Sequence, residues 1–275
     1  ACLPLNHSIS VTSIETKEGQ FCSTEPNDSY GSHCHRIAMA LRSPRPSTWY
    51  TASLDMGTHL KTKHLLSMLD LTTEETLSLL ARASELKRGS HSTGMTGKTL
   101  AILFEKPSLR TRVGLEIAMF QMGGYATTLS QAEVGLGVRE TIEDVSRVLS
   151  RWIDGIACRT TFHSDLEELA TKSSVPVINA LTDVEHPTQG LADLLTIQEV
   201  HGDIANVCIT FIGDGDNVAA SLALGATAIG AEVRISSPEG YDLPKEIVDR
   251  AKALATSSGG SFDLVRDPEK AVLQS

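Results

Sequence analysis

The stretch Phe104-Glu105-Lys106-Pro107-Ser108-Leu109-Arg110-Thr111-Arg112 is the most informative part of this chain. It follows a short apolar run, 99–104, and precedes a segment with helical spacing, 113–122. When a strand, a tight loop and the beginning of a helix follow one another in that order, they direct free backbone N–H groups and the positive end of a helix dipole toward one place. Pro107 fits this interpretation, because a proline near a first helical turn gives up no intrahelical hydrogen bond.

The side chains of the same turn predict an anion site. Arg110 and Arg112 are cations at a helix N-terminus, where they oppose the dipole and cost stability unless an anion offsets them. Ser108 and Thr111 add two hydroxyl groups. A doubly charged phosphate is the ligand that suits such a turn. The alternative is an exposed basic helix end without a ligand, and we favour the phosphate.

Length and composition limit the class of protein. The chain has 275 residues, of which 41% are hydrophobic, and a formal net charge of -10. This length is enough for two modest α/β domains, each with its own core. The acidic balance argues against a nucleic-acid partner, because nucleic-acid phosphates are bound by basic surfaces. No apolar run approaches the roughly 20 residues needed to span a bilayer, so we expect no membrane insertion.

The five cysteines do not indicate a disulfide framework, since their number is odd and their spacing wide. Cys158 and Cys208 fall in predicted buried strands, where we interpret them as small hydrophobic residues. This pattern fits a reducing compartment. Cys22 and Cys34, with His33 and His35 beside the latter, could ligate zinc, but such a crowded triplet rarely makes a closed tetrahedral site.

The first 61 residues lack helical or strand periodicity and are rich in Ser, Thr, Pro and His. We expect residues 1–61 to be a disordered or non-native extension. Three arginines and no acidic residue lie between Asp28 and Asp55, which is weakly reminiscent of an organelle transit peptide. The four acidic residues among the first 28 do not suit a transit peptide, so a cytoplasmic location is expected. A mitochondrial or plastid matrix remains open if the extension is a transit peptide.

Beyond this segment, short apolar runs alternate with helical patterns. Strands are expected at 99–104, 125–129, 155–159, 175–181, 206–212, 232–235 and 261–265. Capping boxes are expected at Thr72–Glu75 and Ser164–Glu167. The alternation predicts an α/β fold with two doubly wound parallel-sheet domains, the second incomplete. The expected divisions are a first domain at 62–186, an interdomain helix at 187–203 and a partial second domain at 204–275.

Three further segments carry candidate functional residues. Arg159 ends a predicted strand, at the edge where open α/β sheets bind ligands, although an ion pair with a nearby carboxylate is the alternative. His186, just beyond another strand, would in isolation be an ordinary cap or loop residue. The run 213–217 follows a strand and opens a helix, as in a dinucleotide loop. It lacks the third spaced glycine, and its two acids would repel a pyrophosphate but suit a cationic ligand.

Together these segments resemble the aspartate/ornithine carbamoyltransferase family. The opening stretch is similar to the family's carbamoyl-phosphate loop, Ser-Thr-Arg-Thr-Arg, with Leu109 in place of the first Thr. Cys158-Arg159-Thr160, His186-Pro187-Thr188-Gln189 and Gly213-Asp214-Gly215-Asp216-Asn217 match in the family's order, and the similarity extends from about Lys63 to Ser275. The resemblance implies transfer of a carbamoyl group from carbamoyl phosphate to L-ornithine, giving citrulline and phosphate. It implies no cofactor or metal, and a homotrimer.

The resemblance also assigns roles to residues. The carbamoyl-phosphate site implied by the family comprises Ser108, Leu109, Arg110, Thr111, Arg159, His186 and Gln189. Within it, Arg110 and Thr111 hold the phosphate, and the catalytic pair Arg159 and His186 polarises the carbonyl group. Gln189 accepts a hydrogen bond from the carbamoyl NH₂, Asn217 contacts ornithine, and Arg112 is mainly structural. Lys106, Asn217 and the run 191–193 resemble the ornithine branch rather than the aspartate branch.

The departures from the family pattern matter equally. Family members continue beyond Ser275 with an Asp-x-x-x-Ser-Met loop and a His-Cys-Leu-Pro loop, and neither occurs in this sequence. The chain therefore resembles a C-terminally truncated member, and we expect no citrulline synthesis from this polypeptide alone. Two alternatives stay open: a non-catalytic module that binds carbamoyl phosphate or another anion, and a carbamoyltransferase for aspartate or another amine.

Overall fold

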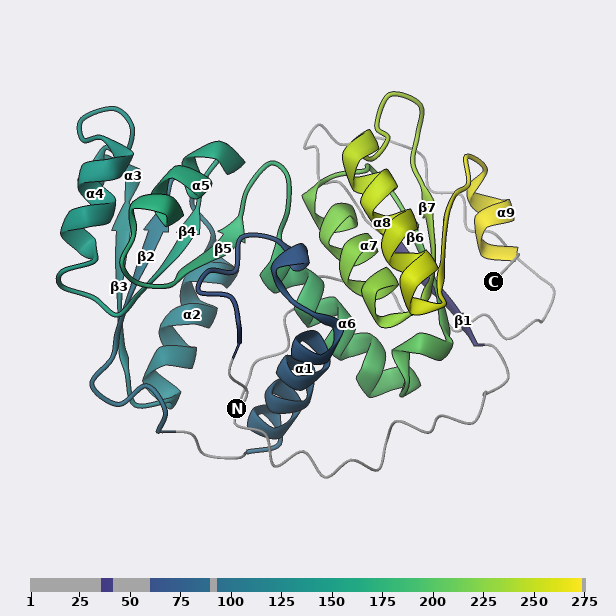
Figure 1. The fold of residues 1–275 in the computed structure, drawn as a ribbon, viewed down its shortest axis with the longest axis horizontal. Helices are drawn as coiled ribbons and strands as arrows, with labels where there is room; N and C mark the ends of the chain where they lie inside the picture. The colour runs from purple at the N-terminus through teal and green to yellow at the C-terminus, as the bar shows by residue number, and fades with distance from the viewer. Residues whose placement is uncertain (1–35, 42–59, 90–92, 274–275) are drawn as a thin grey trace, which may run out of the picture.

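The computed structural model describes residues 36–41, 60–89 and 93–273. Two sheet-and-helix regions lie side by side, and α1 (Thr73–Lys87) and α6 (Pro187–His201) lie between them (Figure 1). Each region is built on its own sheet of parallel strands that alternate with helices. The predicted α/β class with two parallel sheets is confirmed.

The first sheet holds four parallel strands in the order β3-β2-β4-β5. Its strands are β2 (Thr99–Phe104), β3 (Tyr125–Ser130), β4 (Gly155–Arg159) and β5 (Val177–Leu181). Its helices are α2 (Leu109–Gln121), α3 (Gln131–Val134), α4 (Ile142–Leu149) and α5 (His163–Lys172). The continuous apolar run of β2 is buried on both faces: Ile102 packs in a cluster with Met119 of α2, and Leu103 packs in another with Leu166 of α5.

The second sheet has the order β1-β6-β7-β8. Its parallel strands are β6 (Val207–Ile212), β7 (Glu232–Ser236) and β8 (Ser261–Leu264), and its helices are α7 (Asn217–Ile229), α8 (Lys245–Ser258) and α9 (Pro268–Leu273). A 3-10 turn at Ile204–Asn206 precedes β6, and another at Met68–Asp70 precedes α1. Side chains alternate along β6: Ile209 and Phe211 belong to the buried core with α7 and α8, whereas the Thr210 hydroxyl donates to the carbonyl of Ala271 in α9.

Strand β1 (Arg36–Leu41) pairs antiparallel with β6 along the edge of the second sheet. It lies inside residues 1–61, which were expected to lack regular structure, so at these six residues the structure differs from the expectation. The reason is that the strand is defined by pairing with β6, about 170 residues away in sequence, which local periodicity does not report. Residues 1–35 and 42–59 lie outside the described residues, and the domain boundaries stay a prediction.

One of the two predicted capping boxes is present and the other is wrong. The Thr72 hydroxyl accepts from the Glu75 N–H at 3.2 Å and the Glu75 carboxylate accepts from the Thr72 N–H at 2.8 Å, so α1 begins as expected. Helix α5, however, begins at His163 rather than after Ser164. The carboxylate of Asp183 accepts from the His163 N–H at 2.8 Å, so a residue from the loop after β5 supplies the cap.

The described cysteines behave as the sequence predicted. Cys158 and Cys208 form no disulfide and are buried in β4 and β6. Burial raises the pKa of the Cys158 thiol to about 12, so it stays neutral and packs as an apolar side chain. The cysteines and histidines of the zinc alternative, Cys22, His33, Cys34 and His35, lie outside the described residues.

Within the described ranges no group of three or more His, Cys, Asp or Glu side chains is placed to hold a metal ion. None of the helices in that part of the chain combines the length and the apolar character needed to cross a membrane.

Candidate active site

The predicted anion turn forms the start of helix α2. Ser108 is the N-cap in extended conformation; its hydroxyl accepts from the Thr111 N–H at a long 3.4 Å and donates to the Thr111 hydroxyl at 3.0 Å. The first turn contains no acidic side chain. The N–H groups of Leu109 and Arg110 belong to the set that a helix leaves without internal partners, so this turn presents N–H donors at its positive end.

The strand order places Arg159 at the same edge as this turn. Strand β2 has β3 on one side and β4 on the other, so the chain changes direction across the sheet after β3. Phe104, the last residue of β2, pairs with Arg159, the last residue of β4. Ligands of open α/β sheets bind at such a switch point, beyond the carboxyl ends of the strands.

Arg110 and Arg159 bring two positive charges to this switch point. Burial, and then the charge of Arg110, lower the pKa of the Arg159 guanidinium below its usual range. The Nε atom of Arg159 is buried and has no hydrogen-bond partner among the described residues. Within those residues neither arginine takes part in an ion pair. Guanidinium groups without a counter-charge near a helix N-terminus are an arrangement that suits an anion.

The alternative for Arg159 was an ion pair with a nearby carboxylate. The carboxylate of Glu105 makes other contacts instead. Glu105 accepts from the Thr160 hydroxyl at 2.8 Å and from the Thr161 N–H at 2.5 Å. Burial opposes ionisation of Glu105, but these hydrogen bonds outweigh it and lower the pKa of its carboxyl. Glu105 therefore fixes the loop that follows Arg159, a contact that the sequence did not reveal because its partners lie 55 residues away.

Arg112 is separated from this site by its own partner. Its Nε lies 3.0 Å from the Glu116 carboxylate, which also accepts from the Thr128 hydroxyl at 2.6 Å. This ion pair supports the structural interpretation of Arg112. Of the two arginines in the turn, Arg110 is the one left for a ligand.

His186 lies beyond the end of β5 as the N-cap residue of α6. Its side chain is buried, its N–H donates to the Ser221 hydroxyl at 2.9 Å, and its Nδ1 lies 3.2 Å from the Thr188 hydroxyl. The approach to His186 includes Leu181, whose φ of 147° is strained for a residue with a side chain. The Asn179 side chain supports that conformation by accepting from the Leu181 N–H at 2.9 Å.

Glu185, which the sequence gave no reason to select, anchors the backbone beside His186. Its buried carboxylate accepts from the Ser67 hydroxyl, from the Met68 N–H at 3.0 Å and from the Ser221 hydroxyl at 3.0 Å. Ser221 belongs to α7, which can come close to α6 because Gly190 has no side chain. A Cβ on Gly190 would lie only 3.1–3.2 Å from Ser221. Gly190 was the only local signal of this helix contact.

Gln189 lies in the first turn of α6. Its Nε2 donates to the Oδ1 of Asp193 at 2.8 Å, one turn further along the helix. Asp193 is buried, and this burial raises the pKa of its carboxyl to about 6. The sequence singled out Asp193 only as part of a branch marker, and its contact with Gln189 is new information from the structure.

The Gly213–Asn217 loop has a closed helix end. Asp216 caps α7 by accepting from the N–H groups of Val218 at 3.0 Å and Ala219 at 3.1 Å. The N–H groups that a pyrophosphate would need are therefore bound to a carboxylate, which argues against the dinucleotide alternative. Gly215 is required by a close approach, since a Cβ there would lie 2.3 Å from the Leu243 nitrogen.

Asn217, the candidate ornithine contact, reaches from the second sheet toward the first. Its Nδ2 donates to the carbonyl of Thr182 at 2.5 Å, in the loop between β5 and His186. The structure therefore places Asn217 beside the loop that carries His186.

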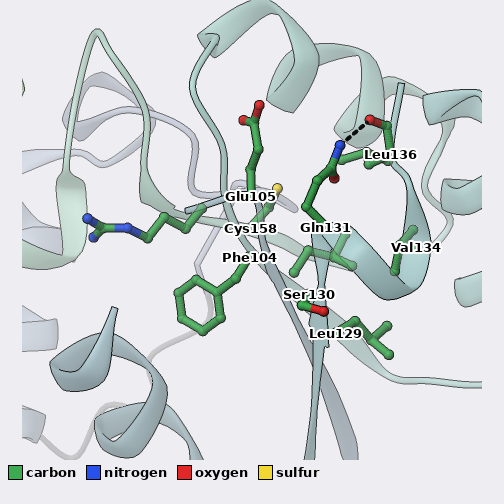
Figure 2. Close-up of a pocket in the computed structure, with 10 residues that line it drawn as sticks. Phe104, Glu105, Leu129, Ser130, Gln131, Val134, Leu136 and Cys158 are labelled. Carbon is green, nitrogen blue, oxygen red and sulfur yellow. Dashed lines mark hydrogen bonds between the residues drawn. The ribbon is translucent and has the colours of Figure 1, made fainter. Parts of the chain in front are cut away.

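A pocket lies at this edge of the first sheet, where Glu105 and Cys158 are among the residues that line it (Figure 2). Its walls come from the carboxyl ends of β2, β3 and β4 and from α3, where Gln131 donates to the Leu136 carbonyl at 2.9 Å. The lining residues are Leu103, Phe104, Glu105, Leu129, Ser130, Gln131, Val134, Leu136, Cys158 and Arg159.

Comparison with known proteins identifies the family. Residues 63–199 match the carbamoyl-P binding domain of aspartate/ornithine carbamoyltransferases, and residues 205–275 match the Asp/Orn binding domain. The chain belongs to the aspartate/ornithine carbamoyltransferase family. Both domains of the family are thus represented in this chain, and the predicted membership is confirmed.

Ornithine carbamoyltransferases are among its similar relatives. The enzyme of Bacillus subtilis is 47% identical over 215 residues, which cover 78% of this chain and 67% of that protein. The enzyme of Pyrococcus abyssi is 46% identical over 221 residues, covering 79% of this chain and 70% of that protein. The solved ornithine carbamoyltransferase of Pyrococcus furiosus superposes with a TM-score of 0.72 at 43% identity, covering 76% of this chain and 68% of that one.

Proposed function

We propose that the reaction this chain serves is transfer of the carbamoyl group of carbamoyl phosphate to L-ornithine, producing citrulline and phosphate; that these 275 residues alone make no citrulline stays a prediction. The observation that carries the proposal is the pair Arg110 and Arg159, two guanidinium groups without a described counter-charge at the N-terminus of α2. Family membership and the names of the similar relatives support the same reaction.

The phosphate dianion would bind where the unsatisfied donors converge. The N–H groups of Leu109 and Arg110, the Thr111 hydroxyl and the guanidinium of Arg110 would hold its oxygens, and the orphan Nε of Arg159 would donate to the same group or to the carbonyl oxygen. These donors stabilise the negative charge that increases on the phosphate as the bond to the carbonyl carbon breaks.

His186 would stabilise the oxygen of the carbamoyl carbonyl. When the Thr188 hydroxyl donates to Nδ1 of His186, the ring proton lies on Nε2, which can then donate to that oxygen. The unprotonated side-chain amine of ornithine attacks the carbonyl carbon, the carbonyl oxygen gains negative charge, and phosphate leaves as the amine loses a proton. A single donor to such an oxygen is typically worth about 3 kcal/mol.

The acceptor site would lie across from this group, at the start of α7. Asn217 is held beside the loop that carries His186, and two carboxylates, Asp214 and Asp216, lie in the same turn. An acidic turn favours a cationic amino acid over aspartate.

The test is a titration with two bisubstrate analogues. N-(phosphonoacetyl)-L-ornithine and N-(phosphonoacetyl)-L-aspartate share the phosphonate and differ only in the amino-acid part. We expect tighter binding of the ornithine compound by isothermal titration calorimetry, and loss of binding in Arg110→Ala. Tighter binding of the aspartate compound would contradict the choice of acceptor. Equal binding of both compounds and of phosphonoacetamide would favour the non-catalytic anion module.

We also propose that the protein assembles as a homotrimer, as the family resemblance implies. Helix α2 supports this, because Val113, Ile117 and Phe120 form an exposed apolar stripe at helical spacing, and Phe120 is 77% exposed. We expect light scattering to give the mass of a trimer for the wild type and a smaller mass for Phe120→Asp. A monomeric wild type would contradict the assembly.

A further inference from the structure

Asp193 is a buried acid that the mechanism above does not use. It lies in the middle of α6 with only 3% of its surface exposed. Burial is the main influence on its pKa, which it raises to about 6, and the hydrogen bond from Gln189 acts in the opposite direction. At neutral pH and above the group is mainly ionised, and a buried carboxylate is costly to folding.

The hydrogen bond from Gln189 stabilises the helix too little to offset the cost of burying the Asp193 carboxylate. A Gln and an Asp four residues apart on an exposed helix face add only slightly to helix stability. An apolar side chain at a fully buried position would stabilise the core more than an ionised carboxylate does. A residue that costs stability at the edge of a ligand site is a candidate for a functional role.

The chemistry of the two groups defines that role. The amide of Gln189 presents an oxygen acceptor on one side and a nitrogen donor on the other, and the two differ little in shape. An ionised carboxylate can only accept, so Asp193 accepts from Nε2, as the 2.8 Å contact shows. The Oε1 of Gln189 is thereby left on the side away from Asp193.

We propose that Asp193 is a positioning residue that fixes the amide of Gln189 so that its Oε1 accepts from the NH₂ of the carbamoyl group. This inference rests on the proposed function, because it takes Gln189 to face the carbamoyl group. It adds to that function the residue that lets the site distinguish carbamoyl phosphate from acetyl phosphate. Acetyl phosphate carries CH₃ in place of NH₂, and a fixed hydrogen-bond acceptor favours the compound with NH₂.

The test compares two stable phosphonates that differ in this one group. Phosphonoacetamide carries the NH₂, and acetonylphosphonate carries CH₃ in its place. Both keep the carbonyl and the phosphonate, so effects on the phosphate clamp or on His186 cancel in the ratio of their dissociation constants. By isothermal titration calorimetry at pH 8 we expect the wild type to prefer phosphonoacetamide by roughly tenfold, the effect of one hydrogen bond.

Substitutions of Asp193 should lower this ratio. In Asp193→Asn the side chain no longer enforces one amide orientation, so we expect a ratio of about 2–3, and in Asp193→Leu a ratio near 1. Gln189→Leu should also give a ratio near 1, and adding Asp193→Leu to it should change the ratio no further. Thr196→Ala is the matched control on the same helix; the Thr196 hydroxyl donates to the Ala192 carbonyl, and the ratio should stay at the wild-type value.

The outcomes separate this inference from the function on which it rests. If both compounds bind but Asp193→Asn and Asp193→Leu keep the wild-type ratio, the positioning role is wrong and the carbamoyltransferase proposal is unaffected. A further fall of the ratio when Asp193→Leu is added to Gln189→Leu also contradicts the role. If the wild type binds neither compound, the proposed function is wrong and this inference is overturned with it. Should Asp193→Leu fail to fold, the isosteric Asp193→Asn decides.

Discussion

Helices α2 and α7 begin in equivalent places, yet their first turns differ in chemistry. Each follows a parallel strand and a short loop at the carboxyl edge of its sheet. At α2 the cap is a long contact from Ser108 and the neighbouring side chains are basic, whereas at α7 the carboxylate of Asp216 accepts two N–H groups. The same strand–loop–helix unit is therefore open to an anion in the first sheet and closed by an internal anion in the second. The side chains of the first turn decide which state occurs.

Removing the cation at the open turn should have the largest effect on ligand binding. We expect Arg110→Ala to weaken binding of phosphonoacetamide by roughly a thousandfold, about 4 kcal/mol, because it leaves the ligand charge partly uncompensated. Arg112→Ala is the matched control, since Arg112 is paired with Glu116, and its effect should be within a few fold. Calorimetric titration measures both. Similar losses in the two variants would contradict the division of roles.

A third helix of the site, α6, adds a prediction about pH. Folding raises the pKa of Asp193 from 3.8 to about 6, so the folded state binds more protons than the unfolded state in this window. The free energy of unfolding of the wild type therefore falls as pH rises from 4 to 6, by about 2 kcal/mol from this group. Asp193→Asn has no ionisable group at this position. Its free energy of unfolding should therefore compare more favourably with that of the wild type at pH 8 than at pH 4. Urea unfolding at both pH values measures the difference, and parallel pH profiles would refute it.

The helix caps Asp216 and Ser108 should differ in how much they contribute to the free energy of unfolding. We expect Asp216→Ala to lower the free energy of unfolding by about 1 kcal/mol, because two N–H groups of α7 lose their acceptor. Ser108→Ala should cost less, since its contact with the Thr111 N–H is 3.4 Å long. Chemical denaturation monitored by circular dichroism compares them. A larger loss in Ser108→Ala than in Asp216→Ala would reverse the open and closed assignments.

The smallest expected effect concerns Leu109, whose side chain is 78% exposed at the open turn. Leu109→Thr restores a hydroxyl beside the ligand and should strengthen phosphonoacetamide binding by about threefold, within the range of one hydrogen bond. The backbone N–H is unchanged, so stability should stay the same within error. Titration of the variant beside the wild type tests this, and unchanged binding would indicate that the ligand does not approach this turn.

The sequence predicted those parts of the molecule that local patterns determine. The strand at 99–104, the helix start after Ser108 and the strand end at Arg159 all follow from apolar runs, a proline and turn residues near in sequence. Strand β1 and the Asp183 cap of α5 were missed because each depends on a segment distant in sequence. The Glu185 network was missed for the same reason, since its partners Ser67 and Ser221 meet only after α6 and α7 pack together.

A phosphate dianion should bind at the N-terminus of α2, between Arg110 and Arg159. A crystal structure of the protein with N-(phosphonoacetyl)-L-ornithine would show whether it does. We predict a phosphonate within hydrogen-bond distance of the Leu109 and Arg110 N–H groups and of both guanidinium groups, with His186 near the carbonyl oxygen. Density for the phosphonate at another place, or Arg159 and His186 directed away from it, would contradict the account.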